Sequence, residues 1–225
     1  MILDVGGGSG VYARWLAGLG HEAHLIDPVE LHLEQARAVK EPALASISRG
    51  EARDLKWPDG GADAVLLSGP LYHLPERGER LRALGEARRV VRPGGLVFAT
   101  GISKFSPVFS GLSRKVFDDG AAVDLVNGVL RDGQHRNPTR HPEYFTTAFF
   151  HHPDELRAEV RDSGLRVEGV FGVEGSAWLL GDLDFYWEDA GRRAQLLGFL
   201  RAVESERSLL GLSAHLLAVG RKAAA

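Results

Sequence analysis

Short apolar segments alternate with segments of helical spacing along the first hundred residues. The apolar runs end at glycine, proline or polar residues, which is typical of buried strands, and they cover residues 1–5, 23–27, 46–50, 62–68 and 96–100. Between them, apolar positions recur every three or four residues, which predicts helices over residues 11–19, 31–39 and 79–91. The run Arg-Pro-Gly-Gly at residues 92–95 is expected to stop the third helix. This alternation favours a parallel sheet with helices on both faces.

The second half of the chain is less regular. Residues 104–147 mix Gly, Pro, His, Arg and Phe without a clean period, which predicts an excursion over the sheet that is part helix and part loop. Beyond it, the pattern predicts helices over 153–163 and 184–206 and strands over 165–173 and 212–220. We expect these last two strands to form an antiparallel pair at the edge of the sheet.

Composition narrows the classes of function. The chain has 225 residues, of which 44% are hydrophobic, so it can bury a sizeable core. A formal net charge of −3 gives no indication of nucleic-acid or membrane binding. The absence of cysteine excludes disulfides and thiolate zinc sites. No apolar run of transmembrane length and no secretory signal is recognised, so we expect a cytoplasmic protein.

A glycine-rich loop follows the first predicted strand. In ILDVGGGSG, Asp4, Gly6, Gly8 and Gly10 form the pattern acid-x-Gly-x-Gly-x-Gly. Glycines lack a Cβ and accept positive φ, so their backbone approaches a ligand closely, and the amides at the start of the next helix favour polar or anionic groups. Asp4 is placed to fix the loop or to receive a ligand ammonium through water. Asp27, at the end of the second strand, can accept both hydroxyls of an adenosine ribose.

The loop alone leaves two cofactor classes open. Gly8, Gly10 and Ala13 also satisfy the dinucleotide pattern Gly-x-Gly-x-x-Ala, so a nicotinamide-dependent oxidoreductase is a serious alternative at this point. Its weakness is the lack of a recognisable Tyr-x-x-x-Lys pair or other hydride-transfer signature.

Six segments resemble class I S-adenosylmethionine-dependent methyltransferases of the bacterial small-molecule type. They are ILDVGGGSG, LIDP, ADAVLLSGPLYHL, EARRVVRPGGLVFATGIS, FTTAFFHHPDEL and SAHLLAVGRK, and together they cover nearly the whole chain in the family's order. The resemblance implies an α/β fold with a Rossmann-like, doubly wound, seven-stranded sheet whose last strand is antiparallel. It also implies one domain over residues 1–225, with a cofactor-binding half at 1–103, a lid at 104–150 and C-terminal helices and edge strands at 151–225.

The same resemblance assigns the cofactor site for S-adenosyl-L-methionine. Gly6, Gly8 and Gly10 would lie against its amino-acid portion, and Asp27 with the following Pro28 would hold the ribose. The acid-plus-alanine pair that touches adenine in the family reads Glu51-Ala52 here, where aspartate is the commoner acid. Ser68 and Gly69 occupy the place where a strand carbonyl receives the cofactor ammonium.

The chain also departs from the family. Members generally carry a helical segment before the first strand that covers cofactor and substrate, whereas this chain begins inside that strand. Sheet and pocket surface would then be exposed, which allows a homodimer or leaves a cofactor-binding module without catalytic activity.

Methyl transfer needs alignment more than acid–base machinery, because the sulfonium already activates the methyl group. His73, in the loop GPLYHL after the fourth strand, is the candidate base for a hydroxyl or protonated amine acceptor, and packing within the loop is the alternative. Tyr72 is a candidate for orienting the acceptor. We therefore expect methylation of an oxygen or nitrogen atom of a small molecule.

Further side chains are candidates for the acceptor site. The aromatic cluster Tyr144, Phe145, Phe149 and Phe150 would enclose a flat or apolar substrate, with core packing as the alternative. Arg136 and Arg140 would meet an anionic group or lie in solvent. No metal is expected, because the nine histidines show neither the helix spacing nor the carboxylate partner of a zinc enzyme. His215, in the last strand, is expected to make a core or edge hydrogen bond.

Overall fold

The computed structural model describes residues 1–137 and 145–224. The chain folds into two compact units. The first contains residues 1–100, 157–168 and 218–225, and the second contains residues 101–156 and 169–217.

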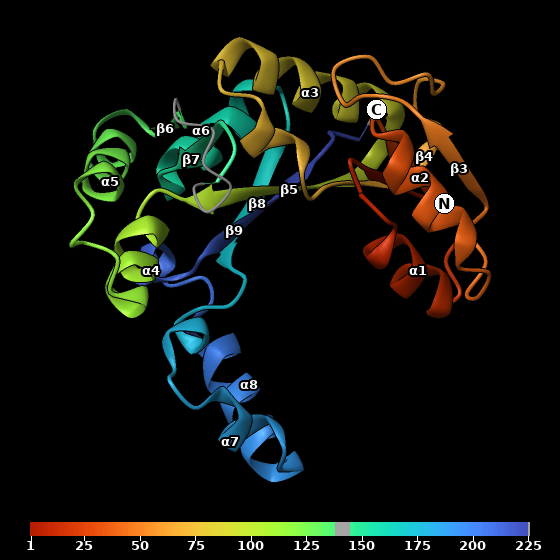
Figure 1. Cartoon of the computed structure of the whole chain (residues 1–225). Coiled ribbons are helices and arrows are strands. Elements are labelled where there is room, and N and C mark those ends of the chain that lie inside the picture. Colours follow the sequence, from red (N-terminus) through yellow and green to blue (C-terminus); the bar gives the residue numbers. More distant parts are fainter. Residues whose placement is uncertain (138–144, 225) are drawn as a thin grey trace. The chain divides into compact units, whose positions relative to one another are not determined.

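The first unit contains the parallel part of the sheet (Figure 1). Its strands are β1 (Ile2–Val5), β2 (Ala23–Asp27), β3 (Ser46–Arg49), β4 (Ala62–Leu67) and the first part of β5 (Val91–Ser103). They pair in the order β3-β2-β1-β4-β5, all parallel. Central β2 is buried at all five positions, whereas edge strand β3 is partly exposed. Burial on both faces explains why the central strands are continuous apolar runs.

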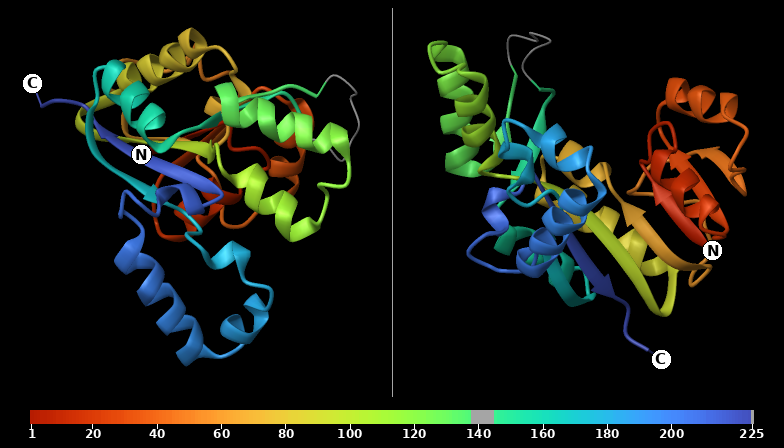
Figure 2. Two further views of the ribbon diagram at one scale, coloured as in Figure 1. Left: turned by 90° about the vertical axis from the view of Figure 1, so that its left-hand side faces the viewer. Right: turned by 90° about the horizontal axis from the view of Figure 1, so that it is seen from below.

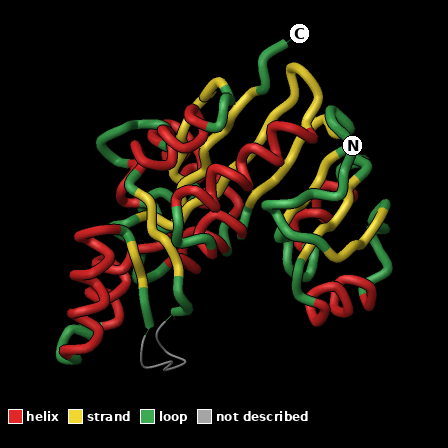
Figure 3. Tube along the Cα trace, turned by 90° about the horizontal axis from the view of Figure 1, so that it is seen from above, coloured by secondary structure: helices red, strands yellow, loops and turns green. Residues whose placement is uncertain are grey.

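Helices flank these strands, as the red tubes beside the yellow ones show in Figure 3. They are α1 (Val11–Gly18), α2 (Glu30–Ala38), the single-turn η1 (Pro70–His73), α3 (Arg77–Val90) and α6 (Pro153–Asp162). Ala13 and Leu16 of α1 pack with Leu33 and Ala36 of α2 around Leu25 of β2. The helical periodicity of the sequence therefore marks the faces that cover the sheet.

The second unit holds the segment that was predicted to be part helix and part loop. It contains α4 (Ser106–Arg114), α5 (Gly120–Asp132), β6 (Gln134–His135) and β7 (Ala148–His151), with α4 and α5 drawn in green in Figure 2. β7 lies parallel to the end of β5, with Phe150 opposite Ile102, and antiparallel to β6. Phe149 and Phe150 of β7 are buried core residues. For these two members of the aromatic cluster, the structure therefore agrees with core packing, the alternative to substrate enclosure. Tyr144 and Arg140 lie outside the described residues, and Arg136 is exposed.

The last strand is antiparallel to β5. β9 (His215–Arg221) pairs with β5 and with β8 (Arg166–Gly172). The Gly94 amide donates to the Lys222 carbonyl, and the Ser103 amide donates to the Ala214 carbonyl, so the two chains run in opposite directions. This confirms the mostly parallel α/β fold with antiparallel strands near the C-terminus. Nine strands join the sheet in the described residues, two more than the predicted seven, because β6 forms within the excursion and β7 directly after it.

Two predicted elements differ in extent. The helix expected over 184–206 is divided into α7 (Leu183–Trp187) and α8 (Ala190–Val203), because the Asp189 side chain accepts a hydrogen bond from the Arg192 amide and so starts a new helix. Helix α3 ends at Val90, and β5 begins at once rather than at residue 96. Its pairing with β4 jumps from Ala62–Val91 to Ala64–Leu96, so the register of the two strands shifts at residues 92–95.

Candidate functional site

The glycine loop joins β1 to α1 in a backbone that non-glycine residues rarely adopt. Gly6, Gly8 and Gly10 have φ of +67°, +59° and +83°. A Cβ on Gly8 would meet only open space, whereas one on Gly6 would lie 2.6 Å from Pro70. The loop therefore presents bare backbone on one side and is packed against the segment after β4 on the other.

Asp4, at the end of β1, links the glycine loop to helix α1. Its Oδ2 accepts a 3.0 Å hydrogen bond from the amide of Ala13 in α1. The carboxyl group is fully buried, and its Oδ1 has no hydrogen-bond partner among the described residues. Desolvation raises the pKa of Asp4 to about 6, although the Ala13 hydrogen bond acts in the opposite direction.

Asp27 ties three parts of the site together at the end of β2. Its Oδ2 accepts from the amide of Gly8 at 2.9 Å, and its Oδ1 accepts from the amide of Val29 at 2.9 Å and lies 3.0 Å from His32 Nδ1. The side chain is 5% exposed. A buried carboxylate with three hydrogen bonds is held in one orientation.

The predicted adenine-contacting pair follows β3. Glu51 is held by Arg53, whose Nε lies 2.9 Å from Oε1 and whose Nη2 lies 2.6 Å from Oε2. The other side of the Arg53 guanidinium bonds to Glu79 of α3. Ala52 is buried beside them. The Glu51 carboxylate thus already has a bidentate partner that the sequence did not indicate.

The segment after β4 carries the predicted catalytic residues. The Tyr72 hydroxyl donates to the Ser68 carbonyl at 3.0 Å, and the Tyr72 ring lies 4.8 Å from the His73 ring. Burial raises the pKa of Tyr72, which keeps the phenol protonated. Partial desolvation lowers the pKa of His73, which favours a neutral imidazole near neutrality although the side chain is accessible to solvent.

A buried ion pair anchors the chain just after His73. Arg80 and Glu159 are each 2% exposed, and their side chains are joined by hydrogen bonds of 2.7–3.1 Å. Arg80 Nη1 also donates to the carbonyls of Leu74 and Pro75, at 2.9 and 2.6 Å. The position of the Tyr72–His73 turn is therefore set by a contact made far from it in sequence.

These groups surround one cavity of about 570 Å³. Most of the predicted residues line it: Gly6, Gly8, Asp27, Pro28, Glu51, Ala52, Gly69, Tyr72 and His73. Three predicted residues do not line the cavity: Asp4, Gly10 and Ser68. Asp4 accepts a hydrogen bond from the Ala13 amide, and Gly10 is the residue before the first turn of α1. The Ser68 carbonyl accepts a hydrogen bond from Tyr72, which does line the cavity. A cavity of this size falls within the range of small-molecule sites, roughly 300–1,000 Å³.

Comparison with known proteins gives the family. Residues 3–99, which carry all of these groups except Glu159, match the family described as "Methyltransferase domain". An uncharacterized methyltransferase of Mycobacterium tuberculosis is 31% identical over 153 residues, 67% of this chain and 55% of that protein. A ubiquinone biosynthesis O-methyltransferase of Burkholderia orbicola is 30% identical over 182 residues, 76% of this chain and 66% of that protein.

Solved structures share the fold. An S-adenosylmethionine-dependent methyltransferase of Methanosarcina mazei superposes with a TM-score of 0.64 at 16% identity, covering 100% of this chain and 92% of the other. One from Mesorhizobium loti also gives 0.64 at 16% identity, covering 98% and 90%. Residues 3–99 therefore carry a methyltransferase domain of the class I S-adenosylmethionine-dependent type. The match of the chain to the mycobacterial relatives spans little more than half of their length.

S-adenosyl-L-methionine is the cofactor of this methyltransferase, and the residues present fit it. Asp4 Oδ1 is buried and has no hydrogen-bond partner among the described residues, and an ammonium in the cavity would reach it through a water. The open space at Gly8 leaves room for a ligand against the backbone, and Asp27 Oδ2 has one further lone pair for a ribose hydroxyl beside the Gly8 amide. When bound, the cofactor supplies a methyl group that the positive sulfur activates for displacement.

The methyltransferase cavity also contains residues that the sequence did not single out. Val29, His32, Arg53, Pro70 and Leu74 line it. His32 is the only one of them with a sequence signal, since it lies five residues after Asp27 at the start of α2. In the described part of the chain, no three His, Cys, Asp or Glu side chains gather in a way that would hold a metal ion. None of the helices described there is long and apolar enough to cross a bilayer.

Proposed function

We propose that this methyltransferase transfers a methyl group from S-adenosyl-L-methionine to an oxygen or nitrogen atom of a small molecule. The observation that carries the proposal is the cavity in which the glycine loop, Asp27 and the Tyr72–His73 turn meet. Relatives named as ubiquinone biosynthesis O-methyltransferases favour an oxygen acceptor. The net charge of −3 supports a small acceptor over nucleic acid or an anionic membrane, and we include a homodimer in the proposal because large apolar side chains of α1 are exposed.

The chain's own contribution is alignment and exclusion of water. Orienting the acceptor for in-line attack contributes roughly 7–11 kcal/mol to lowering a barrier of this kind. His73, whose pKa is lowered by desolvation, is able to accept a proton from a hydroxyl or an ammonium. Tyr72 is held by Ser68 and presents a fixed aromatic face.

Calorimetric titration with S-adenosylhomocysteine, with NADH in parallel, tests the cofactor assignment. We expect micromolar binding of S-adenosylhomocysteine and none of NADH. Preferential binding of NADH would instead support the oxidoreductase alternative.

A screen of hydroxyl- and amine-bearing acceptors, followed by detection of S-adenosylhomocysteine, tests the reaction. Turnover with any of them excludes a non-catalytic module. His73→Ala is expected to lower kcat about 100-fold if His73 is the base, with exposed His21→Ala as the control. Full turnover by His73→Ala would remove His73 from the chemistry.

A further inference from the structure

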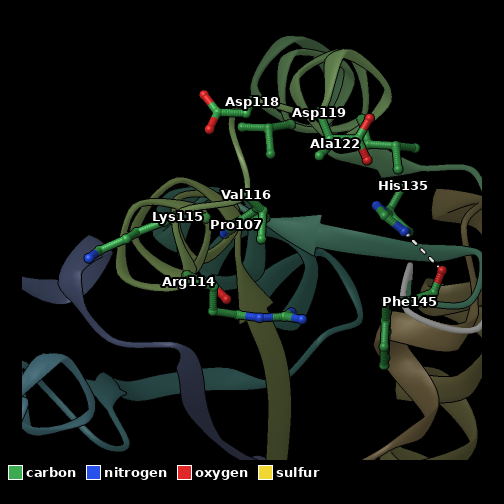
Figure 4. Close-up of a pocket in the computed structure, with 13 residues that line it drawn as sticks. Pro107, Arg114, Lys115, Val116, Asp118, Asp119, Ala122, His135 and Phe145 are labelled. Atoms are coloured by element: carbon green, nitrogen blue, oxygen red, sulfur yellow. Dashed lines mark hydrogen bonds between the residues drawn. The ribbon is translucent and has the colours of Figure 1, made fainter.

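The second unit has a cavity of its own, of about 370 Å³, between α4 and α5 (Figure 4). His135, a buried polar residue of its wall, already donates from Nε2 to the Phe145 carbonyl at 3.0 Å. Its cations, Arg114 and Lys115, are exposed, and Figure 4 shows them extending in opposite directions. The cofactor cavity of the first unit, in contrast, places a buried carboxylate beside a histidine to which the function above gives no role.

The carboxylate of Asp27 has one acceptor position left. Oδ1 accepts from the Val29 amide at 2.9 Å and lies 3.0 Å from His32 Nδ1, and Oδ2 accepts from the Gly8 amide at 2.9 Å. An ionised carboxylate offers about two acceptor positions on each oxygen. Oδ1 is therefore filled by the chain's own donors, whereas Oδ2 keeps one position. A ribose carries two adjacent hydroxyls, so Asp27 accepts from one of them and leaves the other for a second acceptor.

His32 reaches Asp27 because of where helix α2 begins. The helix starts at Glu30, three residues after Asp27, and side chains on a helix tilt toward its N-terminus. His32, in the first turn, therefore points back to the carboxylate that lies five residues before it. Its neighbours in this turn face elsewhere, since Glu30 pairs with Arg37 and Leu31 is exposed. The contact is local in sequence and lies entirely within the first unit.

The contact with Asp27 decides which ring nitrogen of His32 is open. Because a carboxylate only accepts hydrogen bonds, Nδ1 carries the proton, and in the neutral imidazole Nε2 keeps its lone pair. Nε2 makes no hydrogen bond to another group among the residues that the structure describes. His32 lines the cofactor cavity, and its side chain is 41% exposed, against 5% for Asp27. The ring therefore brings a second acceptor to the cavity wall.

Other polar groups of this wall are already engaged. Glu51 and Arg53 bind each other through hydrogen bonds of 2.6 and 2.9 Å. The Tyr72 hydroxyl donates to the Ser68 carbonyl. Beside Asp27, the acceptor that stays open is Nε2 of His32.

We propose that His32 is a further cofactor-binding residue of this methyltransferase: Oδ2 of Asp27 accepts from one ribose hydroxyl of S-adenosyl-L-methionine, and Nε2 of His32 accepts from the other. The hydrogen bond between Nδ1 and Oδ1 joins the two acceptors, so that the planar ring and the carboxylate act as one unit. The proposal rests on the cofactor assignment above. It does not depend on which atom of which acceptor is methylated.

Calorimetric titration with S-adenosylhomocysteine and with its 2′-deoxy and 3′-deoxy analogues tests the contact. In the wild type, we expect the loss of the hydroxyl on the Asp27 carboxylate to weaken binding about tenfold or more, and the loss of the hydroxyl on the neutral imidazole to weaken it about threefold to tenfold. His32→Phe keeps a ring but has no nitrogen. This variant should bind S-adenosylhomocysteine and the analogue that lacks the His32-bound hydroxyl equally well, while the other analogue still binds more weakly. His21→Phe, on the exposed surface and outside the cavity, should behave as the wild type.

Two more variants separate a direct contact from support of Asp27. In His32→Asn, the amide nitrogen takes the place of Nδ1 and can still donate to Asp27, but no atom takes the place of Nε2. In His32→Gln, the longer side chain carries its amide at the position of Nε2. We expect His32→Asn to behave like His32→Phe, and His32→Gln to keep part of the preference for both hydroxyls. If His32→Asn restored the wild-type pattern, His32 would act only by holding Asp27, and the proposal would be wrong.

The failure of this proposal can be told apart from the failure of the cofactor assignment. If His32→Phe weakens all three ligands by the same factor, or weakens none of them, the direct contact is overturned and the cofactor assignment stands. Urea unfolding of each variant shows that it is folded before titration. If the folded wild-type protein binds no S-adenosylhomocysteine, the cofactor assignment itself is wrong, and the proposal is wrong with it.

Discussion

The backbone amide of Gly8 donates a 2.9 Å hydrogen bond to Oδ2 of Asp27. The glycine loop is thereby fastened to the carboxylate that is expected to hold the cofactor ribose. Asp27 thus has two expected tasks, since the side chain that orders the loop also lines the cofactor cavity. Removing it should affect loop order and cofactor binding together.

We expect Asp27→Ala to weaken S-adenosylhomocysteine binding at least about tenfold, because a hydrogen bond to a charged group contributes about 1.5–3 kcal/mol. Asp27→Asn should be nearly as weak, because its single carbonyl oxygen can accept from only one of the Gly8 and Val29 amides. Glu30→Gln, an exposed acid three residues further on, is the control. Calorimetry measures the affinities, and unchanged binding in Asp27→Ala would remove Asp27 from the cofactor site.

A side chain at residue 69 should clash with the glycine loop, because the segment after β4 passes close to it. A Cβ there would lie 2.8 Å from the Gly6 carbonyl oxygen, so Gly69→Ala must displace the glycine loop. We expect a loss of about 1–3 kcal/mol in the free energy of unfolding, as for other overpacked sites, together with weaker S-adenosylhomocysteine binding. Gly78→Ala, where a Cβ on α3 meets nothing within 4 Å, should be neutral or slightly stabilising. Urea unfolding of both variants checks this.

The buried Asp4 carboxyl should make stability fall as pH rises. Its pKa in the folded protein is about 6, above the ordinary aspartate value of 3.8, so the folded state retains the proton in the window between these values. The stabilisation by protonated Asp4 is therefore present at low pH and lost between about pH 4 and pH 6, up to about 3 kcal/mol. Urea unfolding of the wild type and Asp4→Asn across this window should show the difference. A pH-independent difference would contradict the shift.

Cofactor binding should respond to the same group with the opposite sign. The cofactor ammonium favours ionised Asp4, so affinity for S-adenosylhomocysteine should rise with pH up to about 6, by at most about tenfold per pH unit. Above pH 6 it should level off. Calorimetry at several pH values checks this, and Asp4→Asn should abolish the dependence. An affinity that stays flat in the wild type would mean that Asp4 does not meet the ammonium.

Removing only one partner of the buried Arg80–Glu159 pair should lower the free energy of unfolding strongly. Glu159→Gln leaves a buried guanidinium without its counter-charge, and we expect a loss of about 3–5 kcal/mol. The double variant Arg80→Met/Glu159→Leu should recover much of that, because it removes both charges. Arg37→Ala, which breaks the exposed pair with Glu30, should cost less than about 1 kcal/mol. Urea unfolding of these variants separates the two cases.

Local sequence patterns predicted much of the fold. The strands β1, β2 and β4 and the helices α1 and α3 follow from apolar runs and helical spacing, because burial on one or both faces imposes that spacing directly. The division of residues 184–206 was missed because apolar positions continue through Asp189, and only its capping hydrogen bond starts a new helix there. β7 was missed because four buried residues between loops give too short a run to read.

By itself the sequence determined the cofactor loop and the acid at the end of the second strand, because both belong to strand-to-helix turns that are encoded by adjacent residues. Only the tertiary structure decided which distant groups complete the sites. Arg53 reaches Glu79, Arg80 reaches Glu159, and Glu174 meets His215 across 41 positions of sequence. Such partners are chosen by strand pairing and helix packing, which bring together residues whose spacing along the chain carries no signal.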